Sequence, residues 1–99
     1  MLVMLAYDLP DVKHQTLLRK EFEALGGYRV QYSLYLFDGE PHECERVIRY
    51  MRRVVEVYVP EGDVRLIPME NRIWEQQIIL LGLDAEPKER PFAAFVLIW

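Results

Sequence analysis

The sequence predicts an α+β fold in which two helices pack on one face of an antiparallel sheet. Strand-like and helix-like segments alternate in the order strand, helix, strand, helix, strand over roughly the first 80 residues. Each helical segment carries a single apolar stripe, so each can bury only one side. A two-layer sandwich buries both stripes against one sheet, and a second copy of the chain would then cover the other sheet face.

The composition is typical of one folded domain. The 99 residues are 52% hydrophobic and 28% charged, which suits a modest core. Cys44 is the only cysteine, which excludes an internal disulfide and agrees with a reducing compartment. The formal net charge of −4 argues against a protein that coats nucleic acid indiscriminately. With no apolar run of bilayer length and no leader motif, we expect a cytoplasmic protein without membrane association.

The first expected strand, residues 2–8, decides where an acidic group lies. Its apolar run before Tyr7 indicates a strand buried on both faces, which has no place for a carboxylate. Asp8 must therefore stand where the strand ends. Pro10 stops the ladder and Asp11 can cap a following helix, so Asp8 either caps local backbone or takes part in chemistry.

The first helix is expected over residues 11–25. Leu18, Phe22 and Leu25 recur at helical spacing, and Gly26 and Gly27 end the run. The outer side is a mixed charged surface that includes His14 and Arg19. His14 has no partner ligand in view, so we interpret it as a surface residue.

Residues 28–37 are aromatic and β-branched, which predicts strand throughout. The segment is long for one strand, so it either bends near residues 31–33 or is two short strands divided there. Alternation places four polar or aromatic residues on one face: Arg29, Gln31, Ser33 and Tyr35. That row either holds phosphate or is simply a solvent-facing sheet surface.

Pro41 opens a second helix with the cleanest apolar stripe in the chain. The stripe comprises Cys44, Val47, Ile48, Met51, Val54 and Val55. Cys44 therefore belongs to the core. The other side carries Arg46, Arg49, Arg52 and Arg53 among glutamates, with Glu45 and Arg49 in the favourable i,i+4 order. This side is either a solvated, ion-paired surface or a phosphate-binding stripe.

The last third of the chain begins with a strand over residues 63–69, with Pro68 marking its end or an edge. A connection follows over residues 70–74, and a short buried strand over 77–82. We divide the chain into a domain, 1–82, a linker, 83–90, and an apolar end, 91–99. Left free, that end would be insoluble, so it is expected to dock as a strand on the sheet of a second copy in a homodimer.

These elements fit a ferredoxin-like sandwich best. The sequence has no glycine-rich phosphate loop, no CxxC pair and no HExxH, which removes the commoner nucleotide and zinc sites. Three ordered segments remain distinctive: Tyr7-Asp8-Leu9-Pro10-Asp11, Gly27 to Tyr35, and Asp63-Val-Arg65-Leu-Ile-Pro68. In these segments the chain resembles the second of the universal CRISPR-associated proteins, the Cas-two family.

The resemblance implies a fold and two possible roles. Members of the family look like ferredoxin-fold homodimers whose C-terminal strand packs on the other subunit. They are described as magnesium-dependent endonucleases acting on single-stranded RNA or duplex DNA, and as the non-catalytic centre of a complex with the Cas-one integrase that inserts new spacers. The family's metal-binding aspartate corresponds to Asp8, its second-motif arginine to Arg29, and an aromatic residue to Tyr35.

A metal site is expected only if two chains meet. Magnesium, or manganese in its place, prefers oxygen ligands, and one carboxylate is a poor site whereas two paired by symmetry are a plausible one. Tyr7 and Ser33 would orient ligands beside Asp8, and Arg29 would hold a phosphate oxygen. The residues expected to contact nucleic acid are Arg19, Arg29, Tyr35, Arg46, Arg49 and Arg53.

Three functions stay open at this point. The first is a metal-dependent endonuclease that takes part in spacer acquisition. The second is a non-catalytic dimeric scaffold that binds duplex DNA on its arginine faces and presents its apolar end to the Cas-one integrase. The third is a regulatory or metabolite-binding ferredoxin-like domain, because this fold serves many functions.

Overall fold

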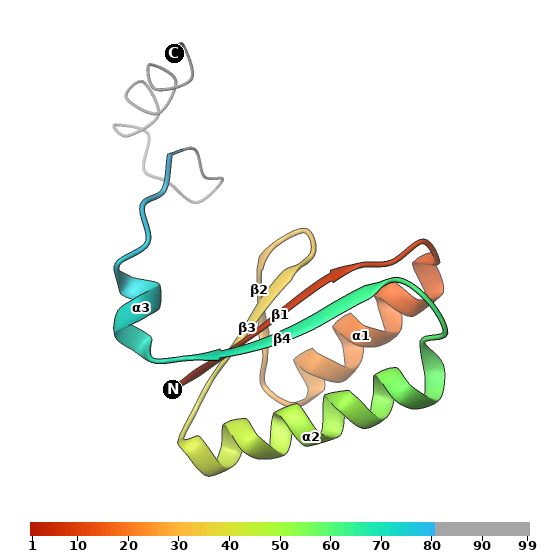
Figure 1. Cartoon of the computed structure of the whole chain (residues 1–99), viewed down its shortest axis with the longest axis horizontal. Coiled ribbons are helices and arrows are strands. Elements are labelled where there is room, and N and C mark those ends of the chain that lie inside the picture. The colour runs from red at the N-terminus through yellow and green to blue at the C-terminus, as the bar shows by residue number, and fades with distance from the viewer. Residues whose placement is uncertain (81–99) are drawn as a thin grey trace.

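The computed structural model describes residues 1–80 of the chain. Four strands and three helices alternate along these residues (Figure 1). The elements are β1 (Leu2–Asp8), α1 (Val12–Ala24), β2 (Tyr28–Gln31), β3 (Leu34–Asp38), α2 (Pro41–Tyr58), β4 (Asp63–Met69) and α3 (Asn71–Glu75). The expected linker, 83–90, and the expected docking strand, 91–99, lie outside the described residues.

The strands form one antiparallel sheet in the order β2-β3-β1-β4. Helices α1 and α2 lie side by side on one face of this sheet, and no helix within residues 1–80 covers the opposite face, which we call the open face (Figure 1). The predicted ferredoxin-like α+β sandwich is therefore confirmed. Whether a second copy covers the open face stays a prediction. None of the helices within residues 1–80 combines the length and the apolar character that a bilayer crossing requires.

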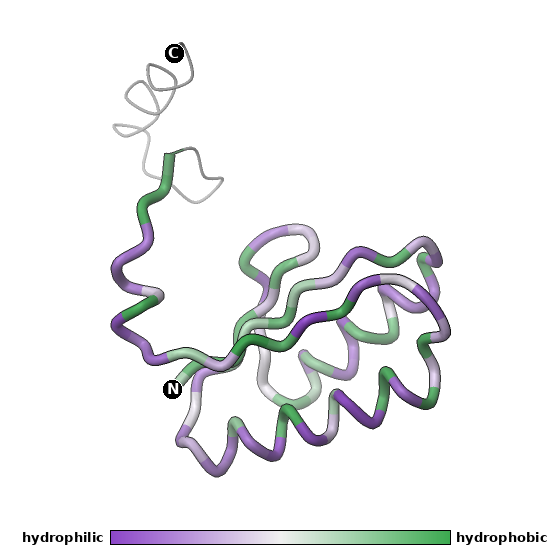
Figure 2. Tube along the Cα trace, in the orientation of Figure 1, coloured by the Kyte–Doolittle hydropathy of each residue, from purple (hydrophilic) through white to green (hydrophobic). Residues whose placement is uncertain are grey.

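The core lies between the sheet and the two helices. Figure 2 shows strand β1 as largely hydrophobic, while both helices alternate hydrophobic and hydrophilic positions. The fully buried members of the core, all below 2% exposed, include Val3, Leu5, Leu18, Phe22, Tyr35, Cys44 and Met51. Each large apolar side chain buried here stabilises the fold by about 1.5–3 kcal/mol. The expectation that β1 is buried on both faces is wrong, because Met4 and Ala6 point to the open face and are only partly buried.

The segment after α1 is two short strands rather than one. A turn at Tyr32 and Ser33 separates β2 from β3, and the register between them shifts between Arg29 and Gln31. Arg29 is paired with Tyr35, whereas Gln31 is paired with Leu34. Because directly paired residues point to the same face, Arg29 and Gln31 point to opposite faces. The predicted polar row of Arg29, Gln31, Ser33 and Tyr35 on one face is therefore wrong.

Both long helices begin at capping residues that can be recognised in the sequence. Asp11 is the N-cap of α1, as expected. Pro41 stands at the start of α2, where the side chains of Glu40 and Glu43 form a reciprocal capping box. Gly26, just past α1, has φ +104°, a left-handed conformation that glycine adopts without a steric penalty.

The chain after β4 differs from the expectation. β4 is an edge strand of the sheet, which suits Pro68 near its end. The expected connection over residues 70–74 contains the short helix α3 instead. Residues 77–80 are not a buried strand, since Ile78, Ile79 and Leu80 are all exposed. An apolar segment becomes a strand only when a sheet edge pairs with it, and no such pairing occurs within residues 1–80.

Candidate functional site

Asp8 occupies the last position of β1, and its side chain is exposed on the open face of the sheet. In the β1–β4 ladder its direct partner is Asp63, the first residue of β4. None of the four ion pairs within residues 1–80 involves Asp8. The carboxylate therefore stands at the end of the central strand β1 with no ion pair to the described part of the chain, which leaves it available to a ligand.

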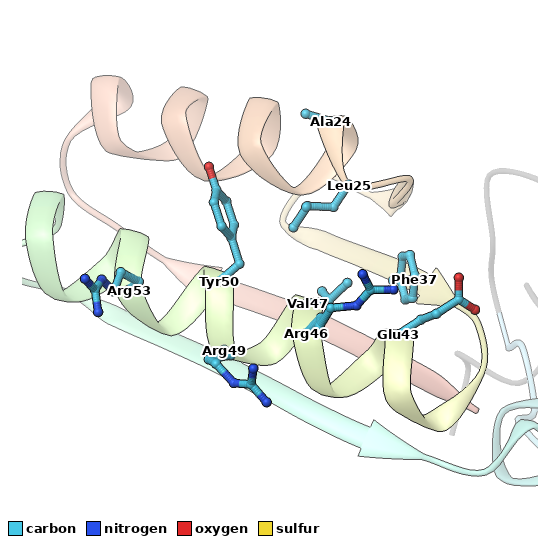
Figure 3. Close-up of a pocket in the computed structure, with 9 residues that line it drawn as sticks. All are labelled: Ala24, Leu25, Phe37, Glu43, Arg46, Val47, Arg49, Tyr50 and Arg53. Carbon is cyan, nitrogen blue, oxygen red and sulfur yellow. The ribbon is translucent and has the colours of Figure 1, made fainter.

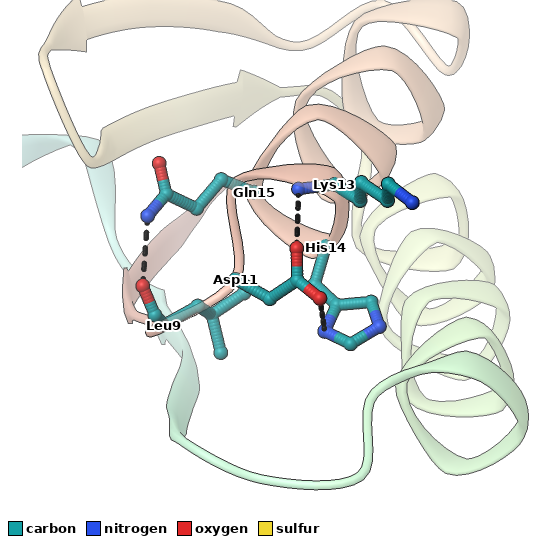
Figure 4. A network of polar contacts seen from close by, with 5 residues as sticks. All are labelled: Leu9, Asp11, Lys13, His14 and Gln15. Atoms are coloured by element: carbon teal, nitrogen blue, oxygen red, sulfur yellow. Dashed lines mark hydrogen bonds and ion pairs between the residues drawn. The ribbon is translucent and has the colours of Figure 1, made fainter.

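The turn after Asp8 is held by polar contacts that do not use its carboxylate (Figure 4). Gln15 donates from Nε2 to the carbonyl of Leu9 at 2.7 Å, and the Lys13 amide donates to Asp11 Oδ1 at 2.8 Å. Asp11 Oδ2 lies 3.9 Å from His14 Nδ1. Asp11 thus caps α1 in place of Asp8, so the backbone-capping alternative for Asp8 finds no support in these contacts.

A shallow pocket of about 270 Å³ surrounds Asp8 on the open sheet face, and we call it the Asp8 pocket. It is lined by Ala6, Tyr7, Asp8, Gln31, Ser33, Leu34, Asp63 and Arg65. The hairpin turn reaches this pocket because the Tyr7 amide donates to the Ser33 carbonyl at 3.3 Å. Of the four predicted catalytic residues, three line this pocket, namely Tyr7, Asp8 and Ser33, and Arg29 does not.

Asp63 and Arg65 are two charged residues of this pocket that were not predicted as site residues. The Arg65 guanidinium donates from Nε and Nη2 to the two Asp63 carboxylate oxygens, at 2.9 and 3.0 Å. This two-pronged hydrogen bond and the Arg65 charge lower the pKa of Asp63, although both side chains are exposed. Arg65 thus favours the ionised form of Asp63 and occupies both of its carboxylate oxygens. Asp8, the strand partner of Asp63, has no ion pair within residues 1–80. The sequence did place Asp63 at the expected start of a strand. It could not show that Asp63 pairs with Asp8, because that pairing depends on the register between β1 and β4.

The side chain of Tyr7 packs on the helix side of the sheet. Its ring stacks on the buried ring of Tyr35 at a centroid distance of 6.2 Å. Burial, followed by the nearby Tyr35, raises the pKa of Tyr7 to about 12. At neutral pH the phenol is therefore protonated, so Tyr7 can donate a hydrogen bond but cannot serve as a base.

Arg29 and Arg19 line a second, smaller pocket of about 130 Å³ between α1 and the β2–β3 hairpin. Its other lining residues are Tyr7, Val12, Gln15, Thr16, Tyr32 and Tyr35. Arg29 lies over the Tyr32 ring at 5.3 Å, and Arg19 pairs with Glu23 at 3.1 Å. Tyr35 is only 1% exposed, so it forms a wall of this pocket and holds Tyr7 in place.

The three predicted arginines of α2 lie apart from both of these pockets. Arg46, Arg49 and Arg53 line a groove between α1 and α2, on the helix layer of the molecule. The i,i+4 pair expected between Glu45 and Arg49 is not among the ion pairs of residues 1–80. The predicted nucleic-acid contacts therefore form two separate groups, one at the hairpin and one on α2.

The donor set around Asp8 limits the metal that one chain can hold. Residues 1–80 contain no group of three or more histidine, cysteine or carboxylate side chains arranged as metal ligands. Asp8 with Asp63 supplies hard oxygen donors at one edge, but Arg65 competes for Asp63. This set fits magnesium or manganese held by one or two carboxylates, with water and substrate phosphates completing the shell. It does not fit a cage built from one chain alone.

Fold and site together define a small ferredoxin-like protein with a carboxylate on its open sheet face that has no ion pair within residues 1–80. The family model of CRISPR associated protein Cas2 matches residues 1–77, which is most of the chain. The chain belongs to this family and is a CRISPR-associated protein of spacer acquisition. No curated protein matches it.

Proposed function

We propose that two copies of the chain form a nuclease that cleaves phosphodiester bonds with a magnesium ion shared by their Asp8 side chains. The observation that carries this proposal is the unpaired Asp8 carboxylate on the open sheet face. A second copy that covers this face around a two-fold axis would bring a second Asp8 towards the first. Two carboxylates would then meet the needs of one hydrated magnesium ion, with manganese as a substitute.

The chain's own residues have distinct tasks in this proposal. When bound, the metal would supply charge neutralisation at the phosphodiester and a more acidic water. Asp8 holds the cation, and Ser33 lines the pocket beside it. The Tyr7 ring lies on the helix side of the sheet, so Tyr7 contributes here through its amide, which donates to the Ser33 carbonyl. Arg65, on the same face, is better placed than Arg29 to hold a phosphate oxygen.

The nuclease proposal is tested with Asp8→Asn, which keeps the shape of the side chain and removes its charge. We expect cleavage of single-stranded RNA and duplex DNA in the presence of magnesium to fall about 100-fold or more, since the cation loses its anionic ligand. Asp11→Asn is the matched control, because asparagine also caps a helix. Cleavage by that control should stay within about twofold of the original chain. Undiminished cleavage by Asp8→Asn would refute the metal mechanism.

A second candidate is the non-catalytic scaffold, which would bind duplex DNA and the Cas-one integrase. It is favoured by the thin ligand set of the Asp8 pocket and by the arginines of α2 that have no ion pair within residues 1–80. Here Asp8→Asn leaves spacer insertion intact, whereas deletion of residues 91–99 abolishes assembly. A truncated chain that still assembles with the integrase would contradict the role given to that segment.

A further inference from the structure

The groove between α1 and α2, on the helix layer, has a volume of about 770 Å³. Its apolar surface comes from Ala24 and Leu25 at the end of α1, Phe37 on β3, and Val47 on α2. Figure 3 shows Leu25 pointing from α1 towards α2, and Tyr50 pointing from α2 towards α1. The groove thus has apolar lining residues between two helices, unlike the Asp8 pocket and the pocket lined by Arg19 and Arg29.

Arginines form the rim of this groove along α2. Arg46, Tyr50 and Arg53 are spaced i, i+4 and i+7, so they follow one stripe of the helix, and Arg49 lies beside them. Figure 3 shows the Arg46 guanidinium extending towards Phe37. None of these arginines takes part in an ion pair within residues 1–80.

Two acidic side chains near the rim accept hydrogen bonds from other groups of the chain. Glu43 accepts a hydrogen bond from the Glu40 amide at 2.8 Å as part of the capping box of α2. Glu21 accepts one from the Tyr50 hydroxyl at 2.7 Å, and this contact joins the two helices. Three arginines and one glutamate, Glu43, line the groove, so its lining carries a formal net positive charge.

We propose that this groove binds an acidic segment of a partner protein. One apolar side chain of the segment would sit on Ala24, which is exposed, and Leu25, which is half-buried, and flanking carboxylates would pair with the rim arginines. Nucleic acid fits less well, because a phosphate backbone has no apolar group for the floor. Phe37 is only 8% exposed, so it has no free ring face on which a base could stack.

This inference goes beyond the proposed function, since it requires neither Asp8 nor a metal. A second copy on the open sheet face would lie on the other side of the sheet from α1 and α2 (Figure 1). Each protomer of such a dimer would keep its groove facing outward. The dimer would then present two equivalent docking sites for partner chains.

The test uses the full chain and a fluorescent synthetic peptide that carries leucines on one helical face, flanked by glutamates. We expect saturable binding by anisotropy, and loss of about tenfold or more in affinity for the double variant Arg46→Gln/Arg53→Gln. Arg52→Gln/Arg72→Gln removes the same charge away from the groove and should bind as the original chain does. Ala24→Glu, at an exposed position on the groove wall, should also weaken binding because it repels the glutamates.

Companion probes separate the proposal from its competitors. Peptides with glutamine for glutamate, or serine for leucine, should each bind more weakly than the parent peptide. The proposal is overturned if the parent peptide shows no saturable binding up to about 1 mM. It is equally overturned if the double variant loses duplex DNA or self-association while peptide binding is unchanged. Asp8→Asn should leave peptide binding intact, so failure here is distinguishable from failure of the nuclease proposal.

Discussion

Tyr7 and Asp8 are neighbours in the chain but face opposite sides of the sheet. The Tyr7 ring stacks on Tyr35 in the helix-side layer, while the Asp8 carboxylate is exposed on the open face. Alternation along a strand imposes this separation. The two side chains of the Tyr-Asp pair therefore have different physical tasks: the tyrosine anchors the strand end, and the aspartate faces the ligand.

The raised pKa of Tyr7 predicts a late-titrating phenol. The ultraviolet absorbance of phenolate, followed against pH, should show a step near pH 12 that is missing in Tyr7→Phe. Because the folded pKa lies above the ordinary value of 10.0, Tyr7 contributes stability fully below pH 10. This contribution is lost as the pH rises through about 12. If the two titration curves coincide, Tyr7 is not desolvated against Tyr35.

A second residue-scale prediction concerns the thiol of Cys44. It is fully buried, and its one S–H lies within reach of two alternative acceptors, the carbonyls of Met1 and Gly39, at Sγ–O distances of 3.5 and 3.6 Å. Burial raises the pKa of this thiol, which lowers the thiolate fraction that reacts. We expect alkylation of the native chain to be at least about 100-fold slower than that of the urea-unfolded chain. Labelling at equal rates, followed by mass spectrometry, would contradict a buried Cys44.

At the scale of elements, the turn between α2 and β4 closes against the end of β1. Gly62 has φ +111°, and a Cβ there would lie 2.5 Å from Leu9 Cδ2 and 2.9 Å from the Asp8 carbonyl oxygen. Gly26 also has a positive φ, but a Cβ at that position would meet only ordinary contacts with Phe37. A substitution at Gly26 would therefore cause backbone strain alone, whereas one at Gly62 would cause backbone strain and a steric clash.

This contrast predicts different costs for the same substitution. Gly26→Ala should lower the free energy of unfolding by about 1 kcal/mol, the cost of a left-handed alanine. Gly62→Ala should cost more, on the order of 2–3 kcal/mol, because the turn must also move away from Asp8 and Leu9. Urea denaturation followed by circular dichroism measures both values. Equal costs would mean that the turn does not pack on the end of β1.

The elements show which features the sequence could predict. The strand end at Asp8, the Asp11 cap and the stripe of α2 depend on local spacing, and all three are confirmed. The pairing of Asp8 with Asp63 depends on the register of two strands distant in the chain, which local spacing does not encode. The polar row failed because the shift between Arg29 and Gln31 interrupts the alternation on which it was based.

At the scale of the whole molecule, the two faces of the sheet differ. One is covered by α1 and α2, and the other carries partly exposed apolar side chains, among them Met4, Leu34 and Ile67. Exposed apolar side chains on one face of a sheet are a common feature of protein interfaces. This surface supports the proposed dimer, which would place the Asp8 pocket of each chain at the junction.

Ile67→Lys tests that dimer. Ile67 is 41% exposed in the single chain, so a lysine should be tolerated by the fold but not by an apolar interface. Light scattering should give a dimer for the original chain and a monomer for the variant. Val57→Lys, at a 63% exposed position on α2, is the control and should remain dimeric. If Ile67→Lys also remains a dimer, the open face is not the interface.

The stoichiometry of manganese binding tests the central claim most directly. Two chains should bind one ion with both Asp8 side chains, so calorimetric titration should give one manganese per dimer. Binding should disappear in Asp8→Asn, which removes both carboxylates of the shared site, and in the monomeric Ile67→Lys variant, which leaves each chain with only one of them. One ion per chain, retained by the Ile67→Lys monomer, would contradict a metal site made by symmetry.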